Sequence, residues 1–177
     1  MMDTLRDCKG CTLCCKVIGV HGVDKPPQTW CTHCAVGEGC TIYHQRPQDC
    51  RFFECMWVEE GSALPEHWLP AHSHMVLCAD MVGPRIEVHV DADHLEAWRQ
   101  EPYYSELRAW SENAIPNGGS IMVYLPERTI VILPHKHVDL GPLDDDAQIV
   151  YVRRWTADGL MPDVELLSPE DPRFERE

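Results

Sequence analysis

The chain has 177 residues, a length that fits one domain and can bury a hydrophobic core without covalent cross-links. Its 15 Lys and Arg residues against 29 Asp and Glu residues give a formal charge of −14, which repels phosphate backbones and anionic lipid headgroups. No run of about 18 apolar residues could span a bilayer, and the first residues lack the apolar region of a secretory signal. We expect a cytoplasmic protein that binds neither nucleic acid nor membranes.

The front of the chain, over 1–60, is rich in cysteine and shows no sustained helical or strand periodicity. A connector follows over 61–75, in which Pro65 and Pro70 fix φ and interrupt regular hydrogen bonding. The sequence therefore predicts a Cys-rich subdomain that something other than a hydrophobic core must hold together.

A sheet subdomain is predicted over 76–157. Apolar and alternating runs indicate one hairpin over 75–90, a second over 121–133 and a further strand over 148–155. Between the hairpins, Asp91 or Asp93 is expected to cap a helix over 94–99.

A second helix after Pro102 is predicted to place Tyr103, Leu107 and Trp110 on one face. The acidic, Pro-containing tail over 158–177 is expected to wrap or fray. The predicted fold class is α+β, with a Cys-rich, metal-bound N-terminal subdomain packed on a small, mainly antiparallel sheet with one or two helices.

Nine of the ten cysteines fall before residue 56. In a chain without an export signal, such clustering favours metal ligation over a disulfide framework. A C-x-x-C turn brings two sulfurs to one ion, and its backbone amides can point at the thiolates. The predicted metal ligands, called here the cysteine cluster, are Cys8, Cys11, Cys14, Cys15, Cys31, Cys34, Cys40, Cys50 and Cys55.

Two arrangements of zinc fit nine thiolates: two ions with one cysteine to spare, or three ions with bridging sulfurs. Cys14 and Cys15 are expected to bind different ions, because neighbouring side chains of an extended segment point to opposite sides. His33 or His44 is an alternative ligand, although a lone histidine in a loop is more often a surface residue. Iron or an iron–sulfur cluster is the alternative to zinc, because four thiolates also hold such clusters. The continuation after Cys14 differs from a ferredoxin run, which favours zinc.

Two stretches of this region read CKGCTLCC (residues 8–15) and GCTIYHQRPQDCR (residues 39–51). They resemble the bacterial YkgJ-like cysteine-cluster proteins, a zinc- or iron-chelating family named for its CxxCxxCC motif. The resemblance covers 8 to about 58 and implies metal chelation, with the choice between zinc and iron left open. Arg46 and Arg51 are predicted to neutralise thiolates or to form surface ion pairs, and Tyr43 and Phe52 to pack the subdomain onto the sheet.

Other candidate ligands are set aside. Cys78 lies in an apolar strand and is interpreted as a buried thiol. A second metal site from histidines on neighbouring strands, His72, His74, His89, His135 and His137, is weighed against core or surface roles, which are preferred. The acidic run 144–146 is interpreted as a solvated turn.

Two functions follow from these residues. The first is a zinc–thiolate protein with a structural or accessory role and a protein partner that the sequence does not identify. The second is an iron or iron–sulfur redox enzyme that uses the cysteine cluster.

Overall fold

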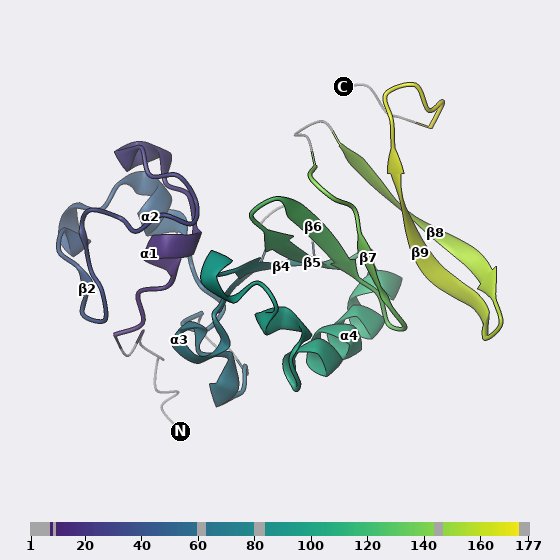
Figure 1. Ribbon diagram of the computed structural model, residues 1–177, viewed down its shortest axis with the longest axis horizontal. Helices are drawn as coiled ribbons and strands as arrows, with labels where there is room; N and C mark the ends of the chain where they lie inside the picture. The colour runs from purple at the N-terminus through teal and green to yellow at the C-terminus, as the bar shows by residue number, and fades with distance from the viewer. Residues whose placement is uncertain (1–7, 9, 60–62, 80–83, 144–146, 174–177) are drawn as a thin grey trace.

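The computed structural model describes residues 8, 10–59, 63–79, 84–143 and 147–173. Figure 1 shows the Cys-rich segment, residues 8–59, on one side of a central sheet and a two-stranded hairpin on the other. The α-helices of the described residues are α1 (Cys14–Val17), α2 (Gln48–Phe52), α3 (Pro70–Ser73) and α4 (Tyr103–Ala114). The α+β fold with few helices is as predicted.

The central sheet has the strand order β3-β4-β5-β6-β7. Its strands are β3 (Met75–Ala79), β4 (Arg85–Val90), β5 (Ser120–Leu125), β6 (Arg128–Ile132) and β7 (His137–Asp139). Both predicted hairpins are confirmed, as β3 with β4 and β5 with β6. Strands β4 and β5 pair in parallel, because α4 carries the chain back across the sheet between them.

One face of the sheet carries the main hydrophobic core. Leu77, Val88 and Ile121 alternate into this face and are almost fully buried beneath Trp98 and Leu107. Leu107 stands on the apolar face of α4, as predicted for that helix. Each such side chain contributes about 1.5–3 kcal/mol to stability, so this face accounts for most of the hydrophobic stabilisation.

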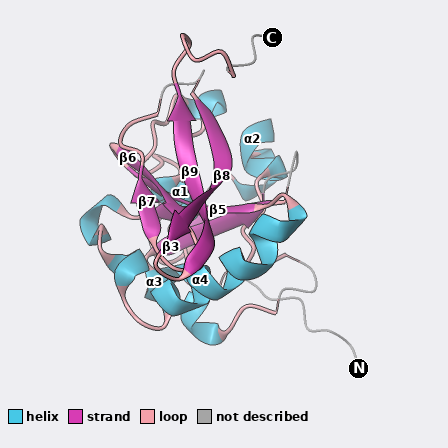
Figure 2. Ribbon diagram, turned by 90° about the vertical axis from the view of Figure 1, so that its right-hand side faces the viewer, coloured by secondary structure: helices cyan, strands magenta, loops and turns pink. Residues whose placement is uncertain are grey.

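The other face of the sheet is covered at its two sides by different segments. Val76 on β3 packs against Leu13 and Val17 of the Cys-rich segment. Met122 on β5 packs in a cluster with Val164 of β9 (Gly159–Leu167). Figure 2 shows β9 and its partner β8 (Gln148–Thr156) crossing in front of the sheet. The middle of this face, between the two covering segments, carries the polar residues Glu87, His89 and Tyr124.

Short elements complete the Cys-rich segment and the connections. The small hairpin consists of β1 (Cys34–Ala35) and β2 (Gly39–Cys40). Single 3₁₀ turns are η1 (His21–Val23), η2 (Tyr43–Gln45), η3 (Glu66–Trp68), η4 (Ala92–His94), η5 (Ala97–Arg99) and η6 (Ile115–Asn117). Among the described residues, no helix is long and apolar enough to cross a membrane.

Two polar contacts attach the Cys-rich segment to the end of β4. Lys16 Nζ lies 2.5 Å from Asp91 Oδ1 and 2.6 Å from Asp93 Oδ2. The amide of Gln28 donates to the Val90 carbonyl and accepts from the Ala92 N–H, each at 2.9 Å. Because both contacts join residues more than 60 positions apart, they fix how the Cys-rich segment sits on the sheet.

Two sequence predictions need correction. Residues 94–99 do not form one helix; the chain makes the separate turns η4 and η5, and Asp91 accepts the Asp93 N–H at 3.1 Å as the predicted cap of the first. The tail does not simply fray, since 159–167 form strand β9, paired along its whole length with β8. The acidic run 144–146 lies outside the described residues.

Candidate metal centre

The first C-x-x-C turn is shaped by a glycine. The Cys11 N–H donates to the Cys8 carbonyl at 2.5 Å. Gly10 has a φ of +73°, which residues other than glycine rarely adopt. A Cβ at Gly10 would lie 2.6 Å from the Gly37 carbonyl oxygen. The turn is therefore packed directly onto the tip of the β1–β2 hairpin.

The second group of cysteines is built on a similar turn and on that hairpin. The Cys34 N–H donates to the Cys31 carbonyl at 3.0 Å, and Cys34 pairs with Cys40 across β1 and β2. The Cys31 N–H donates to the Cys15 carbonyl at 3.0 Å. This last bond joins the two halves of the cysteine cluster, and Cys15 is the residue at which they meet.

The thiols around Cys15 come from four separate parts of the Cys-rich segment. Cys15 hydrogen-bonds through its side chain to Cys14 and Cys34; the bond with Cys14 and burial raise its pKa, whereas the bond with Cys34 acts to lower it. Burial also raises the pKa of Cys34 to about 11, helped by the neighbouring thiols. The group that interacts here consists of Cys14, Cys15, Cys31, Cys34, Cys40 and Cys50.

Cys14 and Cys15 do not lie in the extended segment that was predicted for them. They begin helix α1, where neighbouring side chains are not driven to opposite sides, and their thiols are hydrogen-bonded to each other. The premise for assigning them to different ions is therefore wrong.

Of the remaining members of the cluster, Cys55 interacts with Cys11 and Cys8 at the junction with the sheet, and Cys11 also interacts with Cys15. Burial raises the pKa of Cys55 to about 11, while the backbone N–H groups of Trp57 and Leu77 act in the opposite direction. Burial likewise raises the pKa of Cys11, and the N–H groups of Leu13 and Ala71 oppose it. Amides aimed at sulfur in this way favour the thiolate form that binds metals.

A buried ammonium lies beside the thiols. Lys25 is only 7% exposed and donates to the carbonyls of Lys16 at 3.0 Å, Ile18 and Pro26 at 3.2 Å. Burial lowers its pKa, whereas the nearby thiols of Cys31, Cys15, Cys14 and Cys50 act to raise it. A cation held among thiols can offset the negative charge of a metal–thiolate site. Nothing in the sequence pattern distinguished this lysine.

Around the RPxxCR stretch, Arg46 acts on a thiol as predicted, whereas Tyr43 and Phe52 do not pack as predicted. Arg46 stacks on Tyr43 at 3.7 Å and donates to the Cys50 carbonyl at 3.5 Å, and its charge lowers the pKa of Cys50 against the larger effect of burial. Arg51 donates to the carbonyls of Arg46 and His44. Tyr43 and Phe52 are 56% and 76% exposed, so they do not pack onto the sheet.

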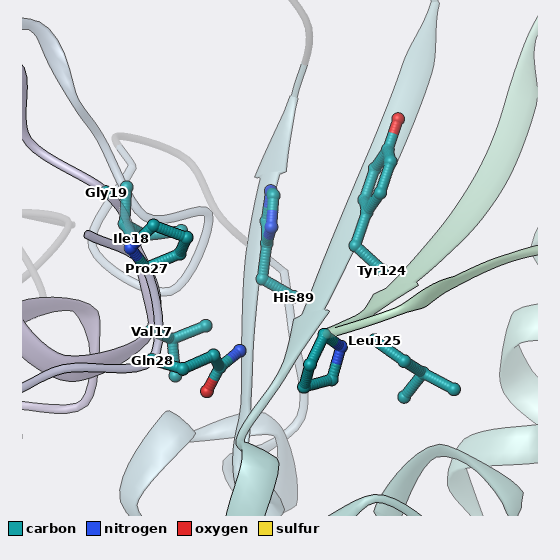
Figure 3. A pocket seen from close by; sticks show the side chains of 9 residues that line it. Val17, Ile18, Gly19, Pro27, Gln28, His89, Tyr124 and Leu125 are labelled. Atoms are coloured by element: carbon teal, nitrogen blue, oxygen red, sulfur yellow. The ribbon is translucent and has the colours of Figure 1, made fainter. Parts of the chain in front are cut away.

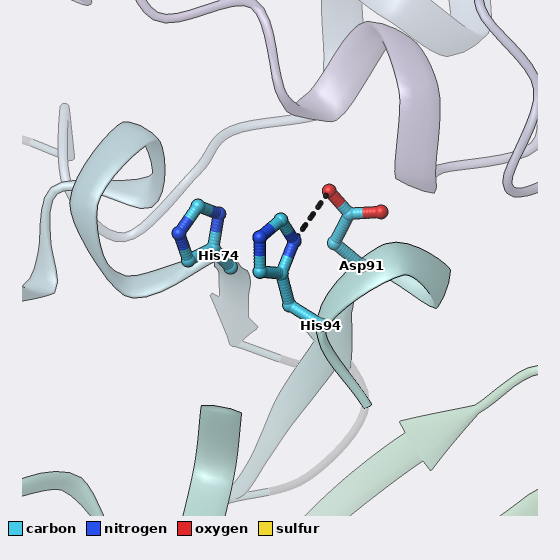
Figure 4. A group of neighbouring side chains, drawn as sticks. All are labelled: His74, Asp91 and His94. Atoms are coloured by element: carbon cyan, nitrogen blue, oxygen red, sulfur yellow. Dashed lines mark ion pairs between the residues drawn. The ribbon is translucent and has the colours of Figure 1, made fainter. Parts of the chain in front are cut away.

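Groups of three ligand atoms within 4.8 Å of one another occur at two places among the described residues, both outside the cysteine cluster. The first is His74, Asp91 and His94, shown in Figure 4. The two imidazoles stack with their centroids 3.6 Å apart, and His94 Nδ1 lies 3.5 Å from Asp91 Oδ2. The ammonium of Lys16 is already bound to the same carboxylate, which disfavours a second cation there.

The second group is Cys78, Glu87 and His89 on β3 and β4. Glu87 Oε2 lies 3.2 Å from His89 Nε2, and burial followed by the charge of Glu87 raises the pKa of Cys78 to about 12. From the sequence, Cys78 was interpreted as a buried thiol and Glu87 was not among the predicted ligands. The signal that was available is the Glu87-x-His89 spacing on the strand that pairs with Cys78.

The other histidines do not join this group. His72 and His74 lie in and just after α3 and not on a strand, so their predicted common strand face is wrong. His137 pairs with Ile132, which packs in the main core, and so it faces away from His89. His137 accepts from or donates to the Tyr104 hydroxyl at 2.9 Å and packs edge-on against Trp98.

A pocket of about 420 Å³ lies between the Cys-rich segment and the sheet. Figure 3 shows His89 and Tyr124 on neighbouring strands along one wall, facing residues of the Cys-rich segment on the other. The lining residues are Val17, Ile18, Gly19, Pro27, Gln28, His89, Tyr124, Leu125 and Pro126. Its volume falls within the range of small-molecule sites.

No protein-family model matches the chain, and the searches of curated proteins and of solved structures found no similar protein. The resemblance of residues 8 to about 58 to the cysteine-cluster family is therefore one of motif alone.

Proposed function

We propose that the chain is a metal–thiolate protein whose cysteine cluster binds zinc and thereby holds the Cys-rich segment in its folded form. The observation that carries this proposal is a set of six interacting thiols that includes Cys15, beside the buried ammonium of Lys25. Thiolates bring negative charge, and a divalent cation together with a buried lysine is the combination that neutralises it.

The packing of the Cys-rich segment supports a structural role for the ion. Before residue 54 its buried apolar contacts lie in a small cluster in which Leu13 and Val17 meet Val76 of the sheet, and only its end, at Trp57, enters the main core. Its helices are four and five residues long and its hairpin strands two. Such short elements are not stable alone, whereas a structural zinc site contributes on the order of 10 kcal/mol to folding.

The donor set favours zinc over hard cations, because the ligands around Cys15 are all sulfur. The residues offer at least two groups of thiols, one around Cys15 and one of Cys8, Cys11 and Cys55. This grouping supports two or more ions. The proposed role is structural or accessory.

Metal removal tests the proposal. The protein is purified without oxygen, and amide hydrogen exchange is compared before and after complete removal of metal by a chelator. We expect exchange protection to be lost over residues 10–59 and to be kept over strands β5 and β6. Unchanged protection over 10–59 in the metal-free, fully reduced protein contradicts a structural role. A brown protein that contains iron contradicts zinc and supports an iron–sulfur cluster.

A further inference from the structure

Three side chains of different chemistry converge on the middle of the second sheet face. In the β3–β4 pairing, Cys78 stands opposite Glu87 and Val76 opposite His89. Because side chains alternate along a strand, Cys78, Glu87 and His89 all project from the same face. Their ligand atoms all lie within 4.8 Å of one another.

We propose that Cys78, Glu87 and His89 form a second metal site, separate from the cysteine cluster, which binds one zinc ion through sulfur, oxygen and nitrogen. Ligands on one tetrahedral zinc ion are about 3.3–3.8 Å apart, given metal–ligand distances of about 2.0–2.3 Å. The separation of His89 Nε2 from Glu87 Oε2, 3.2 Å, is already close to this range. Because the ligand atoms lie within 4.8 Å of one another, small side-chain rotations on the two paired strands bring the Cys78 thiol within bonding distance of the same ion.

The surroundings hold two of the three ligands in place. The nearby cation Arg85 lies 3.9 Å from Glu87 Oε1, farther than Lys16 lies from Asp91, and Glu87 Oε2 faces His89. The Tyr124 hydroxyl donates to Glu87 Oε1 at 3.4 Å, and its ring stacks on His89 with centroids 5.0 Å apart. Both contacts come from β5, the strand next to β4. Partners of this kind orient metal ligands and tune their affinity.

The site is built as an open one. A structural zinc site has four protein ligands, whereas three protein ligands leave a position for water or another small ligand. His89 and Tyr124 line the pocket between the sheet and the Cys-rich segment, so this position is reached from the pocket. The small ligand that fits is an oxygen or sulfur donor able to share the zinc ion.

Two other arrangements of these residues give different outcomes in an experiment. Cys78 also interacts with Cys55, so it is a candidate fourth thiolate for Cys8, Cys11 and Cys55. In that case Glu87 and His89 contribute nothing to metal binding. If they contribute nothing and Cys78 is not a ligand either, the three residues form a hydrogen-bonded group alone.

The test compares the number of zinc ions per chain by native mass spectrometry, with elemental analysis, in the full-length protein. The variants are Cys78→Ser, Glu87→Gln and His89→Gln, and the control is His72→Gln, at an exposed histidine outside the site. We expect each of the three site variants to carry one zinc ion fewer than the wild type and the control to carry the same number. Circular dichroism checks that each variant is folded.

A wild-type zinc content in both Glu87→Gln and His89→Gln overturns the proposal. If only Cys78→Ser then loses a zinc ion, Cys78 is a ligand of the same ion as Cys55. If Cys78→Ser does not fold, the other two variants decide, because neither side chain lies in the hydrophobic core. The comparison of zinc content between the variants does not depend on whether the cysteine cluster binds zinc. Without zinc in that cluster, the wild type carries one ion and His89→Gln carries none.

Discussion

The ammonium of Lys16 on α1 lies 2.5 Å from Asp91 Oδ1 at the end of β4, across 75 residues of sequence. Both side chains are buried, and Asp93 binds the same ammonium from the solvent side. Removing one partner of a buried pair leaves an uncompensated charge, at a cost of about 3–5 kcal/mol. The contact therefore orients the Cys-rich segment on the sheet, and its loss is expected to destabilise the fold strongly.

We expect Lys16→Met to lower the free energy of unfolding by about 3–5 kcal/mol, because Asp91 stays buried without its cation. Urea denaturation at pH 7 measures this change. The matched control is Arg128→Met, which breaks an exposed pair with Asp139 and should cost under about 1 kcal/mol. Equal losses in the two variants contradict the account of Lys16.

The same contact predicts a pH dependence. Burial acts to raise the pKa of Asp91, but hydrogen bonds from Lys16 and the Asp93 N–H outweigh it and hold the pKa below its ordinary value. A depressed carboxyl pKa contributes stability that is present above about pH 4 and is lost as the pH falls through the lowered value.

We therefore expect the difference in unfolding free energy between the wild type and Asp91→Asn to be greatest near neutral pH and to shrink below about pH 4. Urea denaturation at a series of pH values measures it. A difference that stays constant down to pH 2 would show that the carboxylate charge of Asp91 is not what stabilises the contact.

Lys25 is predicted to support metal binding through its charge. When zinc replaces the protons of four thiols, the site changes from neutral to a net charge of −2, which a buried ammonium stabilises. We expect Lys25→Met to weaken zinc binding by about 10- to 100-fold, as for other residues that support metal ligands. Competition with a chromophoric chelator measures the affinity. Lys136→Met, at an exposed lysine paired with Asp163, is the control and should leave it unchanged. An unchanged affinity in Lys25→Met refutes this role.

Substitution of Gly10 is predicted to be destabilising both because of its positive φ and because it lies against the Gly37 carbonyl oxygen. Gly10 and Gly141 share a φ of about +70°, but only Gly10 faces a neighbouring atom, the Gly37 carbonyl oxygen. Gly141→Ala should cost about 1 kcal/mol from backbone strain alone. Gly10→Ala should cost more than that and also lower zinc affinity, since the first C-x-x-C turn must move off the hairpin. Thermal melting and chelator competition compare the two variants, and equal effects would contradict the contact.

Local patterns in the sequence were enough to predict much of the sheet. Alternation at Ile86 and Val88 predicts β4, and the spacing of Tyr103 and Leu107 predicts α4, because each reports a buried face directly. Strand β9 was missed because Pro162 and its acidic neighbours argue against a strand. In a two-stranded ribbon each strand has an unpaired edge, so proline is tolerated there.

The clustering of cysteines could be predicted from the sequence, but the way they group could not. The bond from Cys31 to the Cys15 carbonyl depends on the path of the intervening loop. Lys25 and Glu87 were overlooked for a similar reason, since each gains its importance from residues that a loop or a strand pairing brings to it. Tyr43 and Phe52 were misplaced because aromatic character alone does not say whether a loop residue faces the core.

X-ray absorption spectroscopy at the zinc edge, on protein purified without oxygen, tests most directly whether cysteine thiolates bind the metal. The account predicts an inner shell dominated by sulfur at about 2.3 Å, with a smaller contribution from nitrogen and oxygen. A shell of nitrogen and oxygen alone, at about 2.0–2.1 Å, would contradict it.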